Sequence, residues 1–445
     1  MANFPGTHSR SIRNPFQDSP PNGQTCLAEV EAAEPPPSSR QLKEFTFDLL
    51  HKSGKPWATL LLRGDAEHSK TTPAFVEGAP VTGEVRLDLE SGGEAIHAVA
   101  LSIKGQIITG ALPSEMVTFV DLPTTLWSRS MGDPRNPTND GNKWSQKLKG
   151  KYIWPFSISL PPTVSLPYFG RNEVFHRLPE SFFERHTRGQ IEYEIAVRFT
   201  RPKLRTDHKL STTFNYLPLF KPGPPSGLRQ LAYSQHTALL GPDSDTEGWQ
   251  SSPSVKTRGK LSSSSRSVDA TCTLSLATPL CYTRGTTIPC ALLIECDDPE
   301  ALYLLSSPEA VVMRLRRNVR FHTVEKTTGH YGDDHSKLLW KEELVHSELA
   351  TWWPAADRSL EIDSTETLPV TVSRKMLRGE LYLRSDLITS TSIAHFRIEY
   401  SVVLFPFDAP GYEPLDSEPI IVEPVEIASE YADGPLPIQY SSPLA

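Results

Sequence analysis

Apolar and polar positions alternate with a period of two in most apolar segments of the chain. Residues 81–89 place valine, leucine or glycine at every second position, and residues 193–199 repeat the pattern with aromatic and branched side chains. Such alternation is typical of β-strands with one buried face. Because such a strand must cover its apolar face with a second sheet, the pattern predicts antiparallel β-sandwiches. Helical periodicity is rare, and only residues 178–184 are expected to form a single helical turn.

Two of these segments recur in the second half of the chain at one spacing. Residues 75–88 match residues 282–295, and residues 191–197 match residues 398–404, so the spacing is 207 positions in both cases. A single match between strands is unremarkable because strands resemble one another. Two matches at one offset and in the same order predict a tandem duplication of one domain.

The repeat assigns equivalent positions to two tyrosines. Tyr193 and Tyr400 each alternate in phase with the apolar residues of their segment. We therefore expect both rings to be buried and each hydroxyl to have a hydrogen-bond partner, because a buried phenol without one is costly. Gly78 and Gly285 are expected to be equivalent in the same way.

Three stretches lack apolar periodicity and are rich in polar residues, proline or serine. These are residues 1–40, 222–268 and 429–445. They cannot bury enough apolar surface to offset the entropy of ordering, so we expect two disordered tails and a disordered linker. The predicted fold is all-β, with one β-sandwich domain at 41–221 and a second at 269–428.

Several motifs follow one another in the first half. They are a Gly-x-x-Val-x-Gly step in 75–85, a strand closed by glycine at 99–105, an aromatic-x-Phe-x-x-x-Leu-Pro segment at 154–161, and Leu-Pro-x-Ser-Phe at 178–182 followed by Ile-x-Tyr from 191. Together they resemble the arrestin fold, specifically the arrestin-like proteins of fungi, over roughly 45–428. The resemblance implies a non-enzymatic adaptor that docks on the tails of membrane-protein cargo and brings endocytic or trafficking machinery to them. Sensing of receptor phosphates is not carried over from the receptor-desensitising arrestins, because the sequence contains no unambiguous phosphate sensor or buried polar switch.

Composition narrows the possible classes of protein. The 45 Lys and Arg residues and 53 Asp and Glu residues give a net charge of −8 without a basic block. A protein that binds nucleic acid needs a basic field, so nucleic acid is not an expected partner. Proline accounts for 40 of 445 residues, which excludes a mostly helical chain because an interior proline removes a backbone donor.

The sequence also favours the cytoplasm. No apolar run reaches the length of a membrane span, and residues 1–10 lack the apolar core of a signal peptide. The five cysteines (Cys26, Cys272, Cys281, Cys290 and Cys296) include no Cys-x-x-Cys pair and are expected to be free, reduced thiols. Of these, Cys272, Cys281 and Cys290 lie in strand-like segments and are expected to be buried. The expected location is cytoplasmic, peripheral at the plasma membrane or endosomes.

Enzymatic chemistry is not expected, and no cofactor or metal is predicted. Common nucleophile, dinucleotide, phosphate-loop and zinc-protease motifs are missing from the sequence. The densest titratable cluster contains His330, Asp333, Asp334 and His335. These residues could bind a divalent metal in a metal-dependent enzyme. We favour a polar hairpin loop instead, because Gly, Asp and His suit turns and no further ligands occur at a useful spacing.

The tryptophans offer an alternative function from another class. Trp127, Trp144, Trp352 and Trp353 could line a site for a small molecule or a glycan. Such residues more often cap the ends of a sandwich core.

The N-terminal tail contains Asn14, Pro15 and Phe16. This tripeptide resembles the ligand of EH domains, which act in endocytosis: Asn and Pro start a turn that presents the Phe ring to an apolar pocket. The competing interpretation is a bystander tripeptide in a polar tail.

A ubiquitin ligase is a doubtful partner. Fungal members of the family recruit one through Pro-Pro-x-Tyr or Leu-Pro-x-Tyr, and neither occurs in this sequence. Pro410 and Tyr412 form a degenerate version of the motif, for which an ordinary turn is the simpler interpretation.

A serine run near residue 262 follows several basic residues. Ser262, Ser263, Ser264, Ser265 and Ser267 are candidate sites for a basophilic kinase, whose phosphates would each add about −1.5 to −2 charges. A plain flexible linker has the same composition.

Overall fold

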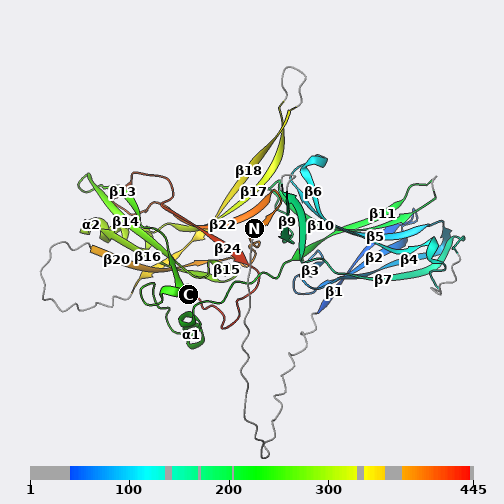
Figure 1. Cartoon of the computed structure of the whole chain (residues 1–445), viewed down its shortest axis with the longest axis horizontal. Coiled ribbons are helices and arrows are strands. Elements are labelled where there is room, and N and C mark those ends of the chain that lie inside the picture. The colour runs from blue at the N-terminus through cyan, green and yellow to red at the C-terminus, as the bar shows by residue number, and fades with distance from the viewer. Residues whose placement is uncertain are drawn as a thin grey trace, which may run out of the picture. The chain divides into compact units, whose positions relative to one another are not determined.

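The computed structural model describes residues 41–135, 143–168, 172–202, 205–327, 335–355 and 373–440 (Figure 1). The predicted peptide motif Asn14-Pro15-Phe16 and the predicted tail 1–40 lie outside the described residues, and so do residues 441–445. The regular secondary structure of the described residues is nearly all β-strand, as the alternation of apolar residues predicts.

The first sandwich consists of two sheets. Their strand orders are β1-β2-β4-β7 and β3-β11-β10-β5-β6. Neighbouring strands are antiparallel except β3 and β11, which are parallel. The strands are β1 (Leu42–Leu50), β2 (Pro56–Asp65), β3 (Ala74–Val76), β4 (Val81–Glu94), β5 (Ala98–Ile108), β6 (Met116–Ser128), β7 (Leu148–Ile158), β10 (Gln190–Thr200) and β11 (His208–Leu217). A separate hairpin of β8 (Thr163–Tyr168) and β9 (Asn172–Arg177) and the short 3₁₀ helices η1 (Pro113–Glu115) and η2 (Arg129–Met131) complete this half.

The second sandwich also has two sheets, with strand orders β19-β20-β16-β14-β13-β23 and β15-β24-β22-β17-β18. Strand β12 pairs with β14, and β21 pairs with β22. The strands are β12 (Trp249–Ser251), β13 (Val255–Leu261), β14 (Arg266–Ala277), β15 (Cys281–Thr283), β16 (Thr287–Cys296), β17 (Met313–Thr327), β18 (His335–Leu349), β19 (Thr351–Pro354), β20 (Ser373–Tyr382), β21 (Thr391–Ile393), β22 (Phe396–Leu404), β23 (Tyr412–Pro414) and β24 (Ile421–Ala428). The helices are α1 (Gly227–Gln235), α2 (Pro299–Leu305), η3 (Thr246–Gly248) and η4 (Pro308–Ala310).

The two halves repeat one topology. The order β1-β2-β4-β7 corresponds to β13-β14-β16-β20, and β3-β11-β10-β5-β6 corresponds to β15-β24-β22-β17-β18. Even the single parallel pairing recurs, since β15 and β24 are parallel as β3 and β11 are. The duplication predicted from the sequence is therefore confirmed in the strand order of both sheets.

The equivalent residues of the repeat adopt equivalent roles. Gly78 and Gly285 both have a positive φ, 81° and 82°, where a side chain would be strained. Tyr193 and Tyr400 lie on the central strands β10 and β22 and are 0% and 3% exposed. The Tyr193 hydroxyl donates to the Pro179 carbonyl at 2.8 Å, and the Tyr400 hydroxyl donates to the Ile388 carbonyl at 2.7 Å. Burial raises the pKa of both hydroxyls.

The predicted disordered linker is wrong. Residues 222–268 contain α1, η3, β12 and β13, and β13 pairs with β14 on one side and β23 on the other. The composition of this stretch suggests disorder because few of its buried residues are large and apolar. Strand β13 buries Thr257, Gly259 and Leu261, of which only the last is a large apolar residue. The second sandwich thus begins near residue 249 rather than at residue 269.

The predicted C-terminal tail also differs over its described part. Ser429 exchanges hydrogen bonds with Phe220: each residue's backbone N–H has a partner on the other at 2.8 to 2.9 Å. Further along, the Tyr440 N–H donates to the carboxylate of Glu380 at 3.0 Å, and its hydroxyl donates to the Thr237 carbonyl at 2.8 Å. Residues 429–440 are therefore held against the sandwich by polar contacts that composition does not reveal.

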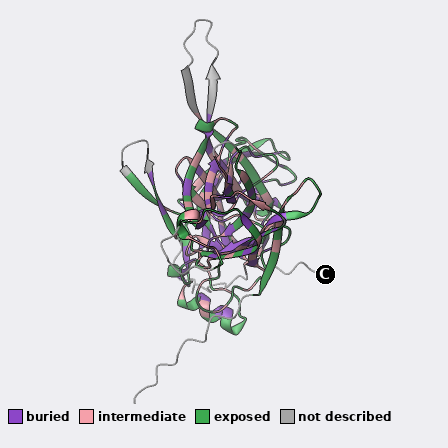
Figure 2. Ribbon diagram, turned by 90° about the vertical axis from the view of Figure 1, so that its right-hand side faces the viewer, coloured by how far each residue is buried: buried purple, intermediate pink, exposed green. Residues whose placement is uncertain are grey.

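Alternating burial positions the core between the sheets. Strand β5 alternates strictly between buried and half-buried residues, and Figure 2 shows buried residues inside and exposed residues on the outer faces. The large side chains that are fully buried include Phe182, Phe199, Phe321 and Phe396. The sheets thus leave their outer faces and edge strands available to solvent.

Candidate functional site

A short segment of the first sandwich, residues 178–189 between β9 and β10, forms two ion pairs with the second sandwich. Residues 178–184 contain no helical turn, so the expectation of one from the sequence is wrong. Phe182 forms a β-bridge with Ile191, and the Ser181 hydroxyl accepts from the Tyr216 N–H at 2.8 Å. These bonds compete with helix formation and fix the carboxylates of Glu180 and Glu184 at the surface of the first sandwich.

Glu180 has both carboxylate oxygens occupied by the second sandwich. The Arg284 guanidinium donates to one oxygen at 2.8 Å, and the Thr389 N–H donates to the other at 3.0 Å. Arg284 also donates to the Leu387 carbonyl at 2.8 Å. Glu180 is buried, so its charge needs these donors.

Glu184 forms a second ion pair four residues later. Both terminal nitrogens of Arg317 donate to its two carboxylate oxygens at 2.7 Å. Burial alone would lower the pKa of Arg317, but hydrogen bonding and the charge of Glu184 outweigh it and raise that pKa. A bidentate pair of this kind is strong and fixes orientation.

Aromatic packing closes the same contact. The ring of Phe182 lies 5.8 Å from the ring of Phe396, and the Arg317 guanidinium lies 5.9 Å from the Phe182 ring. A Cβ at Gly189 would lie 2.7 Å from the ring of Phe396 and 2.8 Å from that of Phe321. Glycine is therefore needed at position 189, where two rings of the second sandwich pack against the first.

Comparison with known families agrees with this architecture. Residues 65–221 match the family model described as arrestin (or S-antigen), N-terminal domain. Residues 65–221 are therefore an arrestin N-terminal domain. The match covers the first sandwich from the end of β2 onward and confirms the resemblance seen in its motifs. A search of curated proteins gave no significant match.

Across the described ranges of the chain, no helix combines the length and the apolar character that a membrane crossing requires.

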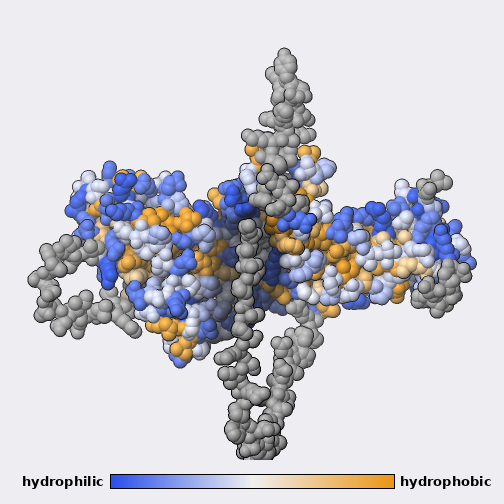
Figure 3. Space-filling model, in the orientation of Figure 1, coloured by the Kyte–Doolittle hydropathy of each residue, from blue (hydrophilic) through white to orange (hydrophobic). Residues whose placement is uncertain are grey.

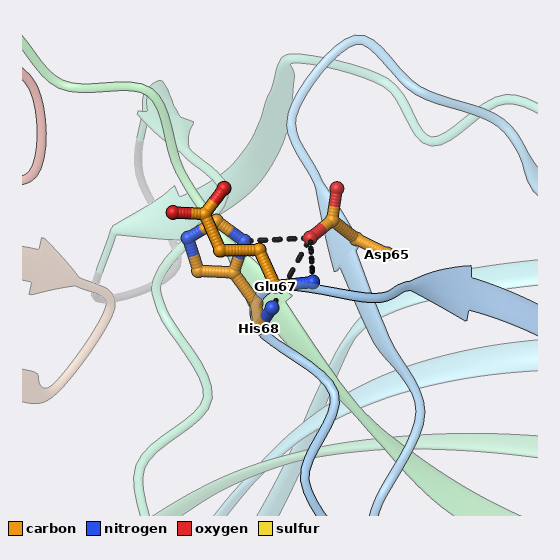
Figure 4. Close-up of side chains that lie close together, drawn as sticks. All are labelled: Asp65, Glu67 and His68. Atoms are coloured by element: carbon orange, nitrogen blue, oxygen red, sulfur yellow. Dashed lines mark hydrogen bonds and ion pairs between the residues drawn. The ribbon is translucent and has the colours of Figure 1, made fainter. Parts of the chain in front are cut away.

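One group of metal-binding residue types lies together, but hydrogen bonds explain it. Asp65, Glu67 and His68 bring one ligand atom each within 4.8 Å (Figure 4). The same Asp65 oxygen accepts from the backbone N–H groups of Glu67 and His68 at 3.1 Å and contacts the His68 ring at 2.8 Å. Burial alone would raise the pKa of Asp65, but these bonds lower it. We interpret the group as a turn held by Asp65.

The predicted cluster of histidines and aspartates lies largely outside the described residues. Residues 328–334, which include His330, Asp333 and Asp334, lie outside the described residues, and the side chain of His335 is not described.

The four tryptophans are divided between the two sandwiches, with Trp127 and Trp144 in the first and Trp352 and Trp353 on β19 of the second. The Trp127 indole is buried and donates to the Gly132 carbonyl at 3.1 Å, and Trp352 is buried against Gly379. Trp144 is half-buried against the same core, and Trp353 is half-exposed on β19. The alternative of a glycan or small-molecule site therefore loses its main support.

Three of the four described cysteines are buried, and all four carry free thiols: Cys272, Cys290 and Cys296 are buried, and Cys281 is half-buried. Burial raises the pKa of Cys272 and of Cys281 to about 12, so both are protonated and unreactive at neutral pH. Cys26 lies outside the described residues.

The degenerate ligase motif is part of the fold. Tyr412 is buried in β23, its N–H donates to the Ala409 carbonyl in a turn, and its ring packs over Gly259. A ligase domain would reach Tyr412 only after β23 left its sheet.

The candidate phosphorylation sites are accessible. Ser262–Ser265 form the exposed turn between β13 and β14, and Ser267 is exposed on β14. The Ser263 hydroxyl donates to Glu300 at 2.9 Å.

Sequence reasoning missed Glu180, Glu184, Arg284 and Arg317. Glu180 occupies the variable position of the Leu-Pro-x-Ser-Phe motif, and Arg284 precedes the repeated glycine. Neither position carries a local signal for a partner more than a hundred residues away.

Proposed function

We propose that this arrestin-like protein is a non-enzymatic adaptor that links membrane-protein cargo to endocytic or trafficking machinery. One observation carries the proposal: two sandwiches of one topology are joined by the ion pairs of Glu180 and Glu184. Such a pair of modules presents several sheet edges and loops in a fixed arrangement. Edges of this kind bind extended peptides by strand addition, which suits the tails of membrane proteins.

The site of action follows from this proposal. The adaptor works in the cytoplasm and associates peripherally with the plasma membrane or endosomes where its cargo resides. Phosphorylation in the turn at Ser262–Ser265 would place negative charge beside the Glu300 carboxylate. The repulsion between the two charges would displace the turn and so regulate the adaptor. A directly bound ubiquitin ligase is not proposed, because Tyr412 is buried.

The proposal is tested by proximity labelling of the full chain in its native cell. Membrane-protein cargo and endocytic adaptors should be enriched over a cytosolic control. Stabilisation of the purified chain by a soluble sugar or metabolite, without enrichment of membrane proteins, would contradict the proposal, since a ligand that binds the native state raises its stability.

Recruitment is assigned to Asn14-Pro15-Phe16, whose phenylalanine would enter the pocket of an EH domain. Short linear peptides lose entropy on binding, so we expect a dissociation constant in the micromolar range or weaker, on the order of 10 μM or more. Phe16→Ala should abolish binding of the full chain to an EH domain and leave the melting temperature unchanged.

The chain offers a matched control for that experiment. Residues 3–5 contain the same three residue types in another order, Asn3-Phe4-Pro5. Phe4→Ala should leave EH-domain binding intact. Equal loss in both variants, or no binding by the unmodified chain, would make Asn14-Pro15-Phe16 a bystander.

A further inference from the structure

Strand β18 is an edge of the second sandwich's six-stranded sheet. Among the strands that the structure describes, its sheet partner is β17 alone, at the end of the order β15-β24-β22-β17-β18. The register is continuous from Arg316 opposite His346 to Thr327 opposite His335. The hairpin of β17 and β18 is long, with 15 residues in each strand (Figure 1). Its outer edge therefore offers an extended, regular row of backbone groups.

The equivalent edge of the first sandwich is protected. Strand β6 carries Pro123 within the strand, and its pairing with β5 shifts register at Val99/Ala100 and again at Gly105/Gln106. Proline and bulges are the devices by which sheet edges avoid pairing with other chains. Strand β18 has no proline, and its register is unbroken over the stretch from Arg316 to Thr327. The two equivalent edge strands, β6 and β18, can therefore be compared directly. Of these two, only β18 lacks the features that prevent pairing with another chain.

Apolar side chains are exposed along this open edge. Trp340 is 43% exposed, Leu344 52% and Val345 50%. Figure 3 shows apolar surface beside this hairpin. The Trp340 ring is held in place by the His322 ring, 3.9 Å away, and by the Arg320 guanidinium at 5.2 Å. An exposed tryptophan with a fixed ring, on a strand whose outer edge is unpaired, is typical of a protein–protein interface.

We propose that β18 pairs with β18 of a second copy of this chain, antiparallel and centred on Glu342. In this register Lys341 lies opposite the partner's Glu343, and Trp340 lies opposite the partner's Leu344. Leu339 lies opposite the partner's Val345. Each contact occurs twice because the two-fold axis repeats it. Apolar and oppositely charged cross-strand pairs of this kind stabilise a sheet.

Glu342 lies on the axis and faces its own copy. Its carboxylate already accepts from the Arg320 guanidinium at 2.9 Å. Two glutamates and two arginines would therefore meet at the centre of the dimer, which offsets the repulsion of the two carboxylates.

Neighbouring registers lack this match. Centring on Lys341 would place Trp340 opposite the partner's Glu342 and Leu339 opposite the partner's Glu343. Centring on Glu343 would place Lys341 opposite the partner's Val345. The sequence Lys341-Glu342-Glu343 is thus complementary to itself about Glu342, and this selects a second copy over a peptide of another composition.

The register is tested by cross-linking the full chain. Directly opposed residues of an antiparallel pair have Cα atoms about 4.5–5.5 Å apart, within reach of a disulfide. Glu342→Cys should therefore form a covalent dimer under mild oxidation. Lys341→Cys is the matched control, because its own copy lies diagonally across the strands, about 7–8 Å away. Cross-linking of both variants alike, or of neither, would overturn the register.

The charge pairs are tested by sedimentation of the uncross-linked protein over its soluble concentration range. Lys341→Glu should weaken the dimer by roughly tenfold, since two attractive pairs become repulsive. The double variant Lys341→Glu, Glu343→Lys should restore the affinity of the dimer, because both cross-strand pairs are again attractive. If the single variant were monomeric only because it failed to fold, the second substitution would not restore the dimer. A chain that stays monomeric at every concentration, or a single reversal that the second does not rescue, would overturn the proposal. A monomer that captures an extended peptide at β18 would overturn it as well.

Discussion

The two sandwiches share a strand order but build their first strand from different residues. Strand β1 turns Phe45, Phe47 and Leu49 towards the core, and all three are half-buried. Strand β13 buries Thr257, Gly259 and Leu261 instead, and the ring of Tyr412 from β23 packs over its glycine. The second sandwich thus replaces large side chains on the strand with one ring supplied by a neighbouring strand. The comparison teaches that topology is retained when the source of the apolar volume changes.

The largest effect is expected at the tyrosines that occupy the same place in both copies. Tyr193→Ala and Tyr400→Ala should each lower the free energy of unfolding by about 3–5 kcal/mol, because each removes a buried ring from a central strand. Chemical denaturation measures the loss. The phenylalanine variants, which keep the ring and lose one hydrogen bond, should cost about 1 kcal/mol. A large loss at one tyrosine and less than about 1 kcal/mol at the other would break the equivalence of the two copies.

A smaller effect distinguishes β13 from β1. A Cβ at Gly259 would overlap the Tyr412 ring, so Gly259→Ala should destabilise the chain by about 1–3 kcal/mol through overpacking. Gly227→Ala is the control, since no atom lies within 4 Å of its added Cβ. Thermal melts of the two variants should differ clearly. Equal melting temperatures would mean that Tyr412 does not fill the space over β13.

The smallest effect concerns the ion pairs between the sandwiches. Glu184→Ala leaves the Arg317 guanidinium without its carboxylate and should cost about 1–2 kcal/mol, a value limited by the partial exposure of Glu184. Calorimetry should also show the transitions of the two sandwiches moving apart. Glu44→Ala is the control, because it removes an exposed ion pair with Arg63 inside the first sandwich. This variant should neither lower the free energy of unfolding by this amount nor separate the two transitions. Identical traces for the two variants would show that Glu184 does not couple the sandwiches.

The sequence predicts the strands whose own residues carry the apolar alternation. Strands β4 and β10 and their repeats β16 and β22 lie where residues 81–89 and 191–197 and their matches predict them. Strand β13 is not predicted from the sequence, because most of its inward residues are small and the serine-rich turn that follows it resembles a linker. Alternation along a strand reveals its buried face only when the apolar side chains that fill the core belong to that strand.

The contacts between the sandwiches could not be predicted in the same way. Arg284 is 104 positions from Glu180, and Arg317 is 133 positions from Glu184. Nothing in the local pattern distinguishes these four residues from the other charged residues on the surface. Their pairing depends on how two separately predicted sandwiches meet, which a pattern along one chain does not encode.

The most direct test of the duplication is hydrogen exchange of the full chain at residues 255–261. If β13 is the counterpart of β1, its backbone N–H groups pair with β14 and β23. We predict that they exchange as slowly as those of residues 42–50 in β1, because exchange then requires the sheet to open. Exchange at the rate of an unstructured peptide of the same sequence would contradict the account. In that case the second half of the chain would lack the strand that completes the repeat.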